Sequence, residues 1–311
     1  SSEKSKTAKQ FNGSSKPEAL VDTRTKPDKG KGKAPVPPEE PLPTAYKVIA
    51  GSYEKLLYGF EGTISVSESS EGTSKSEPSL SFNLKPIFMF SAHASHITAV
   101  AASPQGGKWL ATGSADENIK IWDLRRRFEV GGLQHHNGSI THLGFPSRSH
   151  LLSASEDGTL CLFRTRDWVV LRVLKGHKAR VNSVAVHPTS KVALSVGKDR
   201  TVRMWDLMRG RGVASMKLGK EGELIRWSID GTLSAIQSLA TIDVYTIDML
   251  LVHTIAHPSR IHDIKFYKPS DDGAELLLVG AEDRMVSVYT ISSDPEKEPT
   301  IIARLKGHVN R

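Results

Sequence analysis

Histidine, aspartate and aromatic residues recur together along the chain at spacings that could support hydrolytic chemistry. Each histidine stands 21 to 26 residues before an aspartate, and each aspartate stands six residues before an aromatic residue. A catalytic triad is needed only once, with a nucleophile, oxyanion donors and a distinct pocket. Because this set recurs with little variation, the pattern favours a structural role, and we interpret the chain as a non-enzyme. The expected structural residues are His93, Asp116, Trp122, His136, Asp157, His177, Asp199, Trp205, His257 and Asp283.

Metal and cofactor chemistry finds little support in the sequence. The pair His93 and His96, and the group His135, His136 and His142, have no accompanying cysteine or carboxylate cluster of the kind that holds zinc. No phosphate-binding loop, dinucleotide fingerprint or kinase motif is present. We therefore expect no catalytic residues, no metal and no cofactor.

The elements that position these residues follow a regular period. The aromatic residues Trp122, Phe163, Trp205, Tyr245 and Tyr289 are 40 to 44 residues apart. Between them lie short β-branched and apolar runs, punctuated by Gly, Asp-Gly, Ser-Pro and His-Pro turns, with no long helical periodicity. One unit contains four strands of about seven residues, at 181–187, 191–197, 201–207 and 212–218. The period and the strand pattern predict an all-β repeat array.

The Gly-His pairs, the turn aspartates and the Trp-Asp pairs resemble the WD repeat, whose four-stranded sheets stack as blades of a β-propeller. The resemblance implies a seven-bladed WD-repeat β-propeller over 45–311. The expected blades are 45–90, 91–132, 133–174, 175–218, 219–254 and 255–305, with the start of a seventh at 306–311. Because its strands would be missing, we expect the natural protein to continue past Arg311.

Blade 5 lacks the histidine and the turn aspartate, so we expect it to rely on packing alone. A Ser or Thr on a nearby strand, such as Ser114 or Ser155, would complete the hydrogen-bonded set.

The remaining segments differ in composition. Residues 1–44 hold nine basic and six acidic residues with seven prolines, which predicts a flexible tail. The alternating Lys29, Lys31 and Lys33 could serve nuclear import or simply be solvated. A Ser/Glu-rich stretch at 65–81 is interpreted as an inserted loop. The lone cysteine, Cys161, cannot form an internal disulfide, which favours a reducing compartment, and no apolar run could cross a membrane.

Several stretches resemble one family more closely. They are 48–60, with Ala-Gly-Ser-Tyr-Glu and Leu-Tyr-Gly-Phe; 135–141, with His-His-Asn-Gly-Ser-Ile-Thr; and 187–211, with Ala-Leu-Ser-Val-Gly-Lys-Asp and Arg-Met-Trp-Asp-Leu. They are similar to the nucleolar WD-repeat factors of large-ribosomal-subunit assembly, known in animals as p21-activated kinase-interacting protein and in fungi as a maintenance-of-killer protein. The resemblance runs from about Val48 to the end. It implies a scaffold in the nucleus and nucleolus that associates with pre-ribosomal large-subunit particles, ribosomal RNA and ribosome assembly proteins. It also implies a kinase partner in animal relatives.

Charge is concentrated in one repeat. Residues 171–212 contain ten basic and two acidic residues, a difference equal to the +8 net charge of the whole chain. A concentrated positive field suits phosphate backbones. In propeller geometry one rim should carry Lys175, Lys178, Arg180, Lys198 and Arg200, and we take this rim as the candidate interface for RNA or an acidic partner. The opposite rim should carry Arg125, Arg126, Arg127, Arg164, Arg166, Arg209 and Arg211.

These observations favour binding of ribosomal RNA, through backbone contacts, or of an acidic protein segment. Two other functions stay open on the sequence. One is a kinase-binding negative regulator of p21-activated kinase signalling. The other is a generic peptide-binding WD-repeat adaptor, for which substrate capture would be insensitive to RNase and to high salt.

Overall fold

The computed structural model describes residues 45–67, 79–270 and 273–307. The described residues all belong to one compact unit, 43–311. The predicted tail at 1–44 and residues 308–311 lie outside the described residues. No helix in the described part of the chain is long and apolar enough to cross a membrane.

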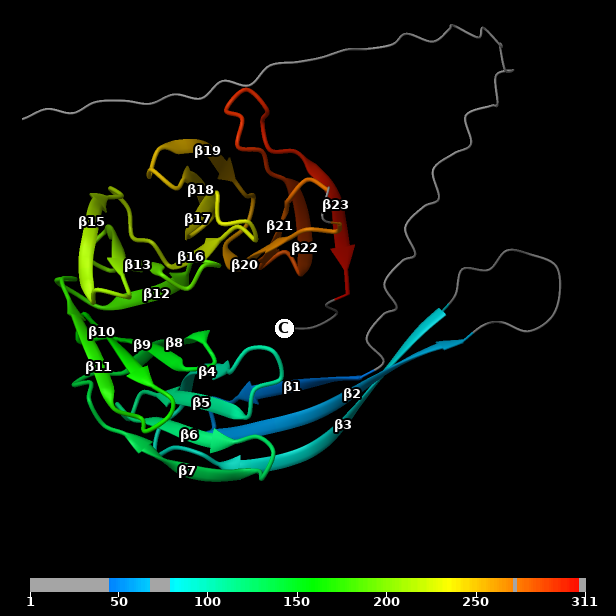
Figure 1. Cartoon of the computed structure of the whole chain (residues 1–311). Coiled ribbons are helices and arrows are strands. Elements are labelled where there is room, and N and C mark those ends of the chain that lie inside the picture. The colour runs from blue at the N-terminus through cyan, green and yellow to red at the C-terminus, as the bar shows by residue number, and fades with distance from the viewer. Residues whose placement is uncertain (1–44, 68–78, 271–272, 308–311) are drawn as a thin grey trace, which may run out of the picture. The chain divides into compact units, whose positions relative to one another are not determined.

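All elements within the described residues are β-strands, which form six antiparallel sheets, here called blades 1 to 6 (Figure 1). Blade 1 has three strands: β1 (Ala45–Gly51), β2 (Leu56–Ser67) and β3 (Ser79–Ser91). Blade 2 comprises β4 (Ile97–Ala102), β5 (Trp109–Ser114), β6 (Ile119–Asp123) and β7 (Phe128–Leu133). Blade 3 comprises β8 (Ile140–Ser147), β9 (His150–Ser155), β10 (Thr159–Arg164) and β11 (Val170–Lys175). Blade 4 comprises β12 (Val181–Val186), β13 (Val192–Gly197), β14 (Thr201–Asp206) and β15 (Arg211–Lys217).

The last two sheets repeat the pattern. Blade 5 comprises β16 (Leu224–Trp227), β17 (Leu233–Ser238), β18 (Thr241–Thr246) and β19 (Leu251–Ala256), and blade 6 comprises β20 (Ile261–Tyr267), β21 (Leu276–Ala281), β22 (Met285–Thr290) and β23 (Ile301–Lys306). The described residues thus form an all-β propeller array of six blades, whereas the sequence pattern predicted seven. Lys306, expected to begin a seventh blade, is instead the last residue of β23.

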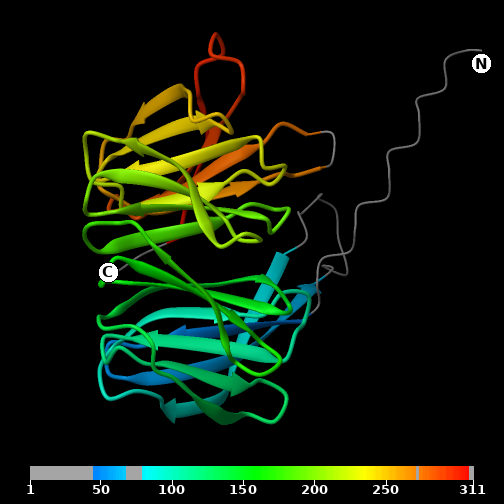
Figure 2. The ribbon, with the colours of Figure 1, turned by 60° about the vertical axis from the view of Figure 1, so that its left-hand side comes forward.

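Each four-stranded blade is a meander of neighbouring strands, and its first strand contacts the first strand of the next blade. In such a meander the turns fall at two opposite ends of the strands, as the side view in Figure 2 shows. One end carries the turns between strands two and three and the links between blades. The other end carries the turns between strands one and two and between strands three and four. The propeller array therefore presents two separate loop surfaces to solvent.

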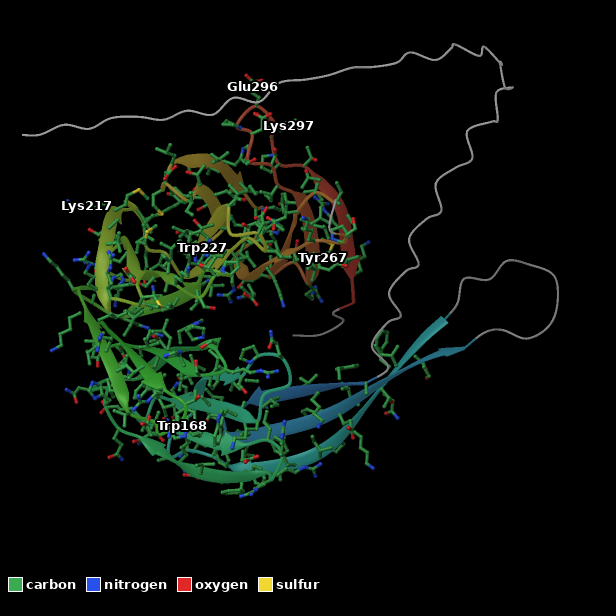
Figure 3. The ribbon with its side chains drawn as sticks, viewed as in Figure 1. Trp168, Lys217, Trp227, Tyr267, Glu296 and Lys297 are labelled. Carbon is green, nitrogen blue, oxygen red and sulfur yellow. The ribbon has the colours of Figure 1, made fainter. Side chains whose placement is uncertain are left out.

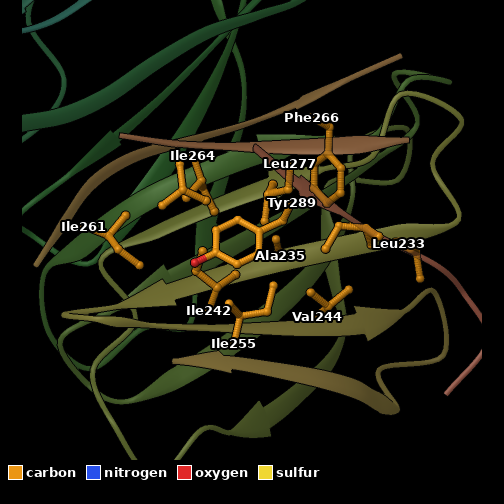
Figure 4. Close-up of a cluster of buried hydrophobic side chains, with 12 residues drawn as sticks. Leu233, Ala235, Ile242, Val244, Ile255, Ile261, Ile264, Phe266, Leu277 and Tyr289 are labelled. Carbon is orange, nitrogen blue, oxygen red and sulfur yellow. The ribbon is translucent and has the colours of Figure 1, made fainter. Parts of the chain in front are cut away.

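Blades pack against each other through alternating apolar side chains. Between blades 5 and 6, Tyr289 of β22 lies among Ile242, Ile255 and Leu277 (Figure 4). Between blades 3 and 4, Trp205 of β14 packs in a cluster with Leu152 and other apolar side chains. Because second strands are covered on both faces, they are apolar and buried along most of their length, as in β13.

Blade 1 lacks the equivalent of a first strand in the described residues. A Cβ on Gly51 of β1 would lie 2.5 Å from Cγ2 of Ile97, and a Cβ on Gly113 of β5 would lie 2.4 Å from Cγ2 of Ile140. Each contact joins a blade to the first residue of the next, so β1 is equivalent to β5, the second strand of blade 2. A register shift just before Phe60 matches the one just before Trp122, so β2 is equivalent to a third strand.

The Ser/Glu-rich stretch is less loop-like than expected. The sequence predicted a loop over 65–81, but β2 extends to Ser67 and β3 begins at Ser79, and the two pair as far as Ser67 with Ser79. Residues 68–78 of the predicted loop lie outside the described residues.

Candidate interaction surfaces

In blades 2, 3 and 4 a histidine connects the link before the blade to the turn between strands two and three. His177 Nδ1 lies 3.0 Å from Asp199 Oδ2, and its Nε2 lies 2.7 Å from Ser195 Oγ. Trp205 Nε1 donates to the same Ser195 Oγ over 2.7 Å. The set therefore ties three parts of the blade together through buried groups.

The same arrangement occurs in the two preceding blades. His93 contacts Asp116 at 3.1 Å and Thr112 at 2.8 Å, and Trp122 donates to Thr112. In blade 3, His136 contacts Asp157 at 3.1 Å and Ser153 at 2.7 Å. Phe163 takes the place of the tryptophan there and has no N–H to donate.

The hydroxyl of each set comes from two residues earlier than the sequence suggested. Thr112, Ser153 and Ser195 point at the histidines. Ser114, which the pattern had offered, donates instead to the carbonyl of His96, and Ser155 donates to the carbonyl of Gly138. The period of two in a strand explains the error, because residues two apart share a face and sequence alone does not choose between them.

The protonation states and burial of these residues also favour a structural role. Burial lowers the pKa of His177 by more than nearby Asp199 raises it, so the imidazole is neutral near pH 7. Burial acts to raise the pKa of Asp199, but hydrogen bonds from Lys178 N–H, Thr201 and His177 outweigh it and lower that pKa. Ser195 is 0% exposed, so no substrate can reach its hydroxyl in this conformation.

Blade 6 keeps the histidine but arranges it differently. Nδ1 of His257 lies 2.9 Å from the hydroxyl of Tyr289, and its Nε2 is 3.6 Å from Asp283 Oδ2. Val279 occupies the place that Ser195 has in blade 4, so the strand hydroxyl is absent there.

Blade 5 does not rely on packing alone, which corrects the expectation from its sequence. Nζ of Lys220 lies 2.8 Å from Oδ2 of the buried Asp243 and donates to Thr241. Nε2 of Gln237 donates to Glu223 Oε2 over 2.8 Å. Hydrogen bonds of a different kind thus join the link before the blade to its second and third strands.

We call the end of the strands that carries the histidine and aspartate turns the histidine face. Lys175, Lys178, Arg180, Lys198 and Arg200 all lie there, in or beside two loops that are bonded together. Lys178 N–H donates to Asp199, and Lys198 N–H donates to the carbonyl of Arg180. The structure therefore brings these five residues to one rim of blade 4.

Acidic residues balance that rim. Across the histidine face of blades 2 to 4, the five predicted basic residues and Lys217 meet five acidic ones: Asp116, Glu117, Glu156, Asp157 and Asp199. Glu156 lies 3.9 Å from Arg180. The five-residue site on this rim stays a prediction, and its net field over three blades is close to zero.

The opposite end of the strands, here called the arginine face, carries the other predicted set. Arg125, Arg126 and Arg127 lie in the turn after β6, Arg164 and Arg166 at or after the end of β10, and Arg209 and Arg211 around the turn after β14. Sequence reasoning missed Lys108, Arg148 and Lys191, which lie in the turns between first and second strands on the same face. Their position in those turns, read with the meander, was the signal that could have found them.

Only three acidic residues accompany these ten basic ones in the turns and strand ends of blades 2 to 4, which leaves a net charge of +7. All three are engaged by their own turns. Asp123 accepts N–H groups of Arg125 and Arg126, Asp167 accepts two bonds from Arg164, and Asp206 accepts the N–H of Arg209. The arginine face is therefore the more basic of the two.

An aromatic pair lies beside these charges. Trp168, in the turn after β10 (Figure 3), packs edge-on against Trp109 with ring centroids 5.2 Å apart, and Nζ of Lys108 stands 4.1 Å above the Trp109 ring. Both rings are partly buried, so they support the turns. No group of three or more histidine, cysteine or carboxylate side chains suited to a metal ion occurs in the described part of the chain.

Comparison with known proteins agrees with this architecture. The model of the family "WD domain, G-beta repeat" matches residues 84–123, 128–164 and 168–206. Protein MAK11 of Saccharomyces cerevisiae is 32% identical over 302 residues, covering 86% of this chain and 71% of MAK11. The chain belongs to the MAK11 family of WD-repeat proteins.

Animal members of the MAK11 family carry another name. A p21-activated protein kinase-interacting protein 1-like protein of Danio rerio is 35% identical over 85% of this chain and 65% of its own length. The human p21-activated protein kinase-interacting protein 1 is 32% identical over 85% of this chain and 63% of its own length. The chain thus spans somewhat less than two-thirds of these animal relatives. Shk1 kinase-binding protein 15 of Schizosaccharomyces pombe is 27% identical over 78% of the chain.

Proposed function

We propose that this protein is a non-enzymatic scaffold of large-ribosomal-subunit assembly in the nucleolus, and that its arginine face contacts the phosphate backbone of ribosomal RNA. The observation that carries the RNA contact is the net charge of +7 on that face, with its three carboxylates engaged locally. The resemblance of residues 48–60, 135–141 and 187–211 to the nucleolar WD-repeat factors supports the setting. Its partners are pre-ribosomal particles and other assembly proteins.

The geometry suits backbone contact better than base reading. The arginines come from equivalent turns of three consecutive blades, so they form an arc rather than a pocket. Contacts to phosphates position a protein on nucleic acid without carrying sequence information. Base recognition in RNA uses exposed aromatic side chains for stacking, and the two tryptophans on this face pack on each other instead.

Charge reversal tests this assignment with a matched control. One variant carries Arg125→Glu, Arg126→Glu, Arg166→Glu and Arg211→Glu on the arginine face. The control carries four reversals on the histidine face, at Lys175, Lys178, Lys198 and Arg200, so both variants change the net charge equally. We expect the first variant to leave pre-60S particles in sucrose gradients and to lose nucleolar enrichment, while the control retains both. Equal retention of the two variants would contradict the arginine-face contact.

A second function is supported by the names of the relatives. Three of the four relatives reported above are named as interacting with p21-activated protein kinase or binding Shk1 kinase. A kinase-binding regulator should capture its kinase from extract after RNase treatment. Depletion should then alter kinase signalling while ribosome production continues, which is the opposite of what the assembly role predicts.

We also propose that a seventh blade completes the ring. Leu278 and Val286, on the outward face of blade 6, are partly exposed, whereas Leu194 and Val202 at the equivalent positions of blade 4 are 0% and 1% exposed. An apolar sheet face of this kind is normally covered by the next blade. Electron microscopy of the natural protein should show seven blades, and a six-bladed ring would contradict this proposal.

A further inference from the structure

A cavity of about 580 Å³ opens beside the outermost strand of blade 4. Its lining includes four basic side chains: Lys178 and Arg200 from the two bonded loops, Arg203 from β14, and Lys217 from the end of β15. Lys217 is labelled in Figure 3. Ser215 and Thr201 bring hydroxyl groups, and they face Arg203 and Lys217 across the strand pair β14–β15.

Arg203 has no partner for its charge among the described residues. Its Nε atom is buried and has no hydrogen-bond acceptor, and no carboxylate lies within ion-pair distance of the guanidinium. Arg203 as a whole is only partly buried, so the cost falls on its Nε atom, which is buried without an acceptor. The cavity therefore contains a cation that the described protein itself leaves uncompensated.

Equivalent positions in the other four-stranded blades do not share this feature. In blade 2 the position holds Lys120, whose Nζ lies 2.9 Å from Glu129 Oε2. In blade 5 it holds Asp243, paired with Lys220. Blades 3 and 6 have Cys161 and Ser287 there, and burial raises the pKa of the Cys161 thiol to about 12, so it is uncharged. Among the described four-stranded blades, blade 4 is thus the one in which the charge lacks a counterion.

The carboxylate in the cavity does not supply that counterion. Asp199 already accepts hydrogen bonds from the Lys178 N–H and from Thr201, and it contacts His177 Nδ1. Four positive charges against one engaged negative charge leave room for an anion of charge −2.

We propose that this cavity binds a phosphomonoester dianion carried by a phosphorylated side chain of a protein partner. A phosphorylated side chain carries about −1.5 to −2 charges at pH 7 and three acceptor oxygens, whereas each phosphate of an RNA backbone carries one. The guanidinium of Arg203 offers the forked donor geometry that matches phosphate oxygens. β15 is an edge strand of its sheet, so an extended peptide can pair along it while its phosphate enters the cavity.

The test uses the full chain and defined probes. We would titrate it into a fluorescein-labelled Gly/Ser peptide with one central phosphoserine, its unphosphorylated twin, and a labelled single-stranded RNA dodecamer, with inorganic phosphate as competitor. We expect the phosphopeptide to bind and its unphosphorylated twin not to bind. Inorganic phosphate should displace the bound phosphopeptide. Equal binding of the twin overturns the proposal, and so does RNA that competes with the phosphopeptide for this cavity.

Two variants locate the binding. Arg203→Gln should weaken phosphopeptide binding at least tenfold, while Lys120→Gln, the same change at the equivalent position of blade 2, should leave it unchanged. Arg203→Gln should also keep or raise the melting temperature, because it removes an uncompensated charge; an arginine with a merely structural role would lower it. If that variant fails to fold, the exposed Lys217→Gln serves instead and should weaken binding severalfold. Unaltered affinity in a folded variant overturns the proposal.

This site is independent of the proposed RNA contact. The arginine-face variant should bind the phosphopeptide like the wild type, and Arg203→Gln should associate with pre-60S particles like the wild type. Failure of one proposal is therefore distinguishable from failure of the other.

Discussion

Nε1 of Trp205 and Nε2 of His177 converge on one oxygen, Oγ of Ser195, each at 2.7 Å. The tryptophan comes from the third strand, the serine from the second and the histidine from the link before the blade. With Asp199 on the far side of the imidazole, the chain of bonds fixes a single tautomer, in which Nδ1 carries the proton and donates to the carboxylate.

Replacing the tryptophan measures the strength of this bond. Trp205→Phe removes the indole N–H, worth about 1 kcal/mol, and leaves a smaller ring in a packed core, which adds about 1–3 kcal/mol. Blade 3 shows that a blade tolerates Phe163 at this place. Urea unfolding should show the loss. Trp168→Phe, at a half-buried position whose indole makes no such bond, is the control and should change stability by less; equal stability of both variants with the wild type would argue against the role of the bond.

Acid should weaken the fold in two steps. Burial lowers the pKa of His93, His136 and His177 below the usual value, about 6.5. Below pH 6.5 the unfolded chain then binds more protons than the folded one, so the free energy of unfolding decreases as the pH is lowered. The lowered pKa of Asp199 adds stability that is present above about pH 4 and is lost as the pH falls through its folded pKa.

Melting temperature as a function of pH checks this. We expect a plateau between pH 7 and 8 and a decline from pH 6.5 to 5. His177→Asn, though less stable at every pH, should show a shallower decline because one of the buried imidazoles is gone. A melting temperature that is independent of pH in this range would rule out the linkage.

The equivalence of β1 and β5 can be tested with one methyl group. A Cβ added to Gly51 or Gly113 would overlap the isoleucine that begins the next blade. Overpacking of this kind costs about 1–3 kcal/mol. Gly51→Ala and Gly113→Ala should therefore destabilise the protein by similar amounts in urea unfolding. Gly131→Ala, where a Cβ would meet nothing within 4 Å, is the control; a harmless Gly51→Ala would mean that β1 is not packed like β5.

Glu275 joins blade 6 to blade 5. Its Oε1 accepts the N–H of Ile229 over 2.7 Å and that of Asp230 over 3.3 Å. Glu275→Ala leaves these N–H groups without an acceptor, at a cost of about 1–3 kcal/mol. Glu275→Gln keeps an acceptor and should recover most of that loss. Hydrogen exchange at Ile229 reports the effect directly, and unchanged protection in the alanine variant would show that water replaces the carboxylate.

Salt dependence offers a measurement of the arginine face in solution. For each RNA phosphate that the protein no longer neutralises, the slope of log affinity against log salt should fall by about one. Arg126→Gln and Arg166→Gln, measured singly on a labelled RNA fragment, should each reduce the slope in this way, while Lys198→Gln on the histidine face should not. A slope that is the same in all three variants would contradict the predicted interface.

Regular repeats were predictable because their signals are local. The aromatic period located Trp122, Trp205 and Tyr289, and the turn aspartates predicted where the second and third strands meet. The division of the basic residues between two opposite faces was also predictable, because successive strands of a meander run in opposite directions. Arg126 and Arg166 follow equivalent strands and therefore lie on one face.

Other features depend on contacts that no period reveals. Lys220 and Asp243 are 23 residues apart with no repeated motif to pair them, so the bonds of blade 5 were missed. The uncompensated charge of Arg203 depends on the absence of a partner among the described residues, which only packing shows. That blade 1 has no first strand in the described part of the chain was hidden because β1 looks like any other strand in the sequence.

The meander has a consequence for how the protein folds. Within each of blades 2 to 6 every strand pairs with a neighbour in sequence, so the pairings that build a blade are formed over short chain distances. Low sequence separation speeds folding, and repeat proteins can nucleate in one unit and propagate to the next. We therefore expect blades 2 to 4, with their bonded histidines, to form early during synthesis and to serve as the template on which the less regular blades 5 and 6 assemble.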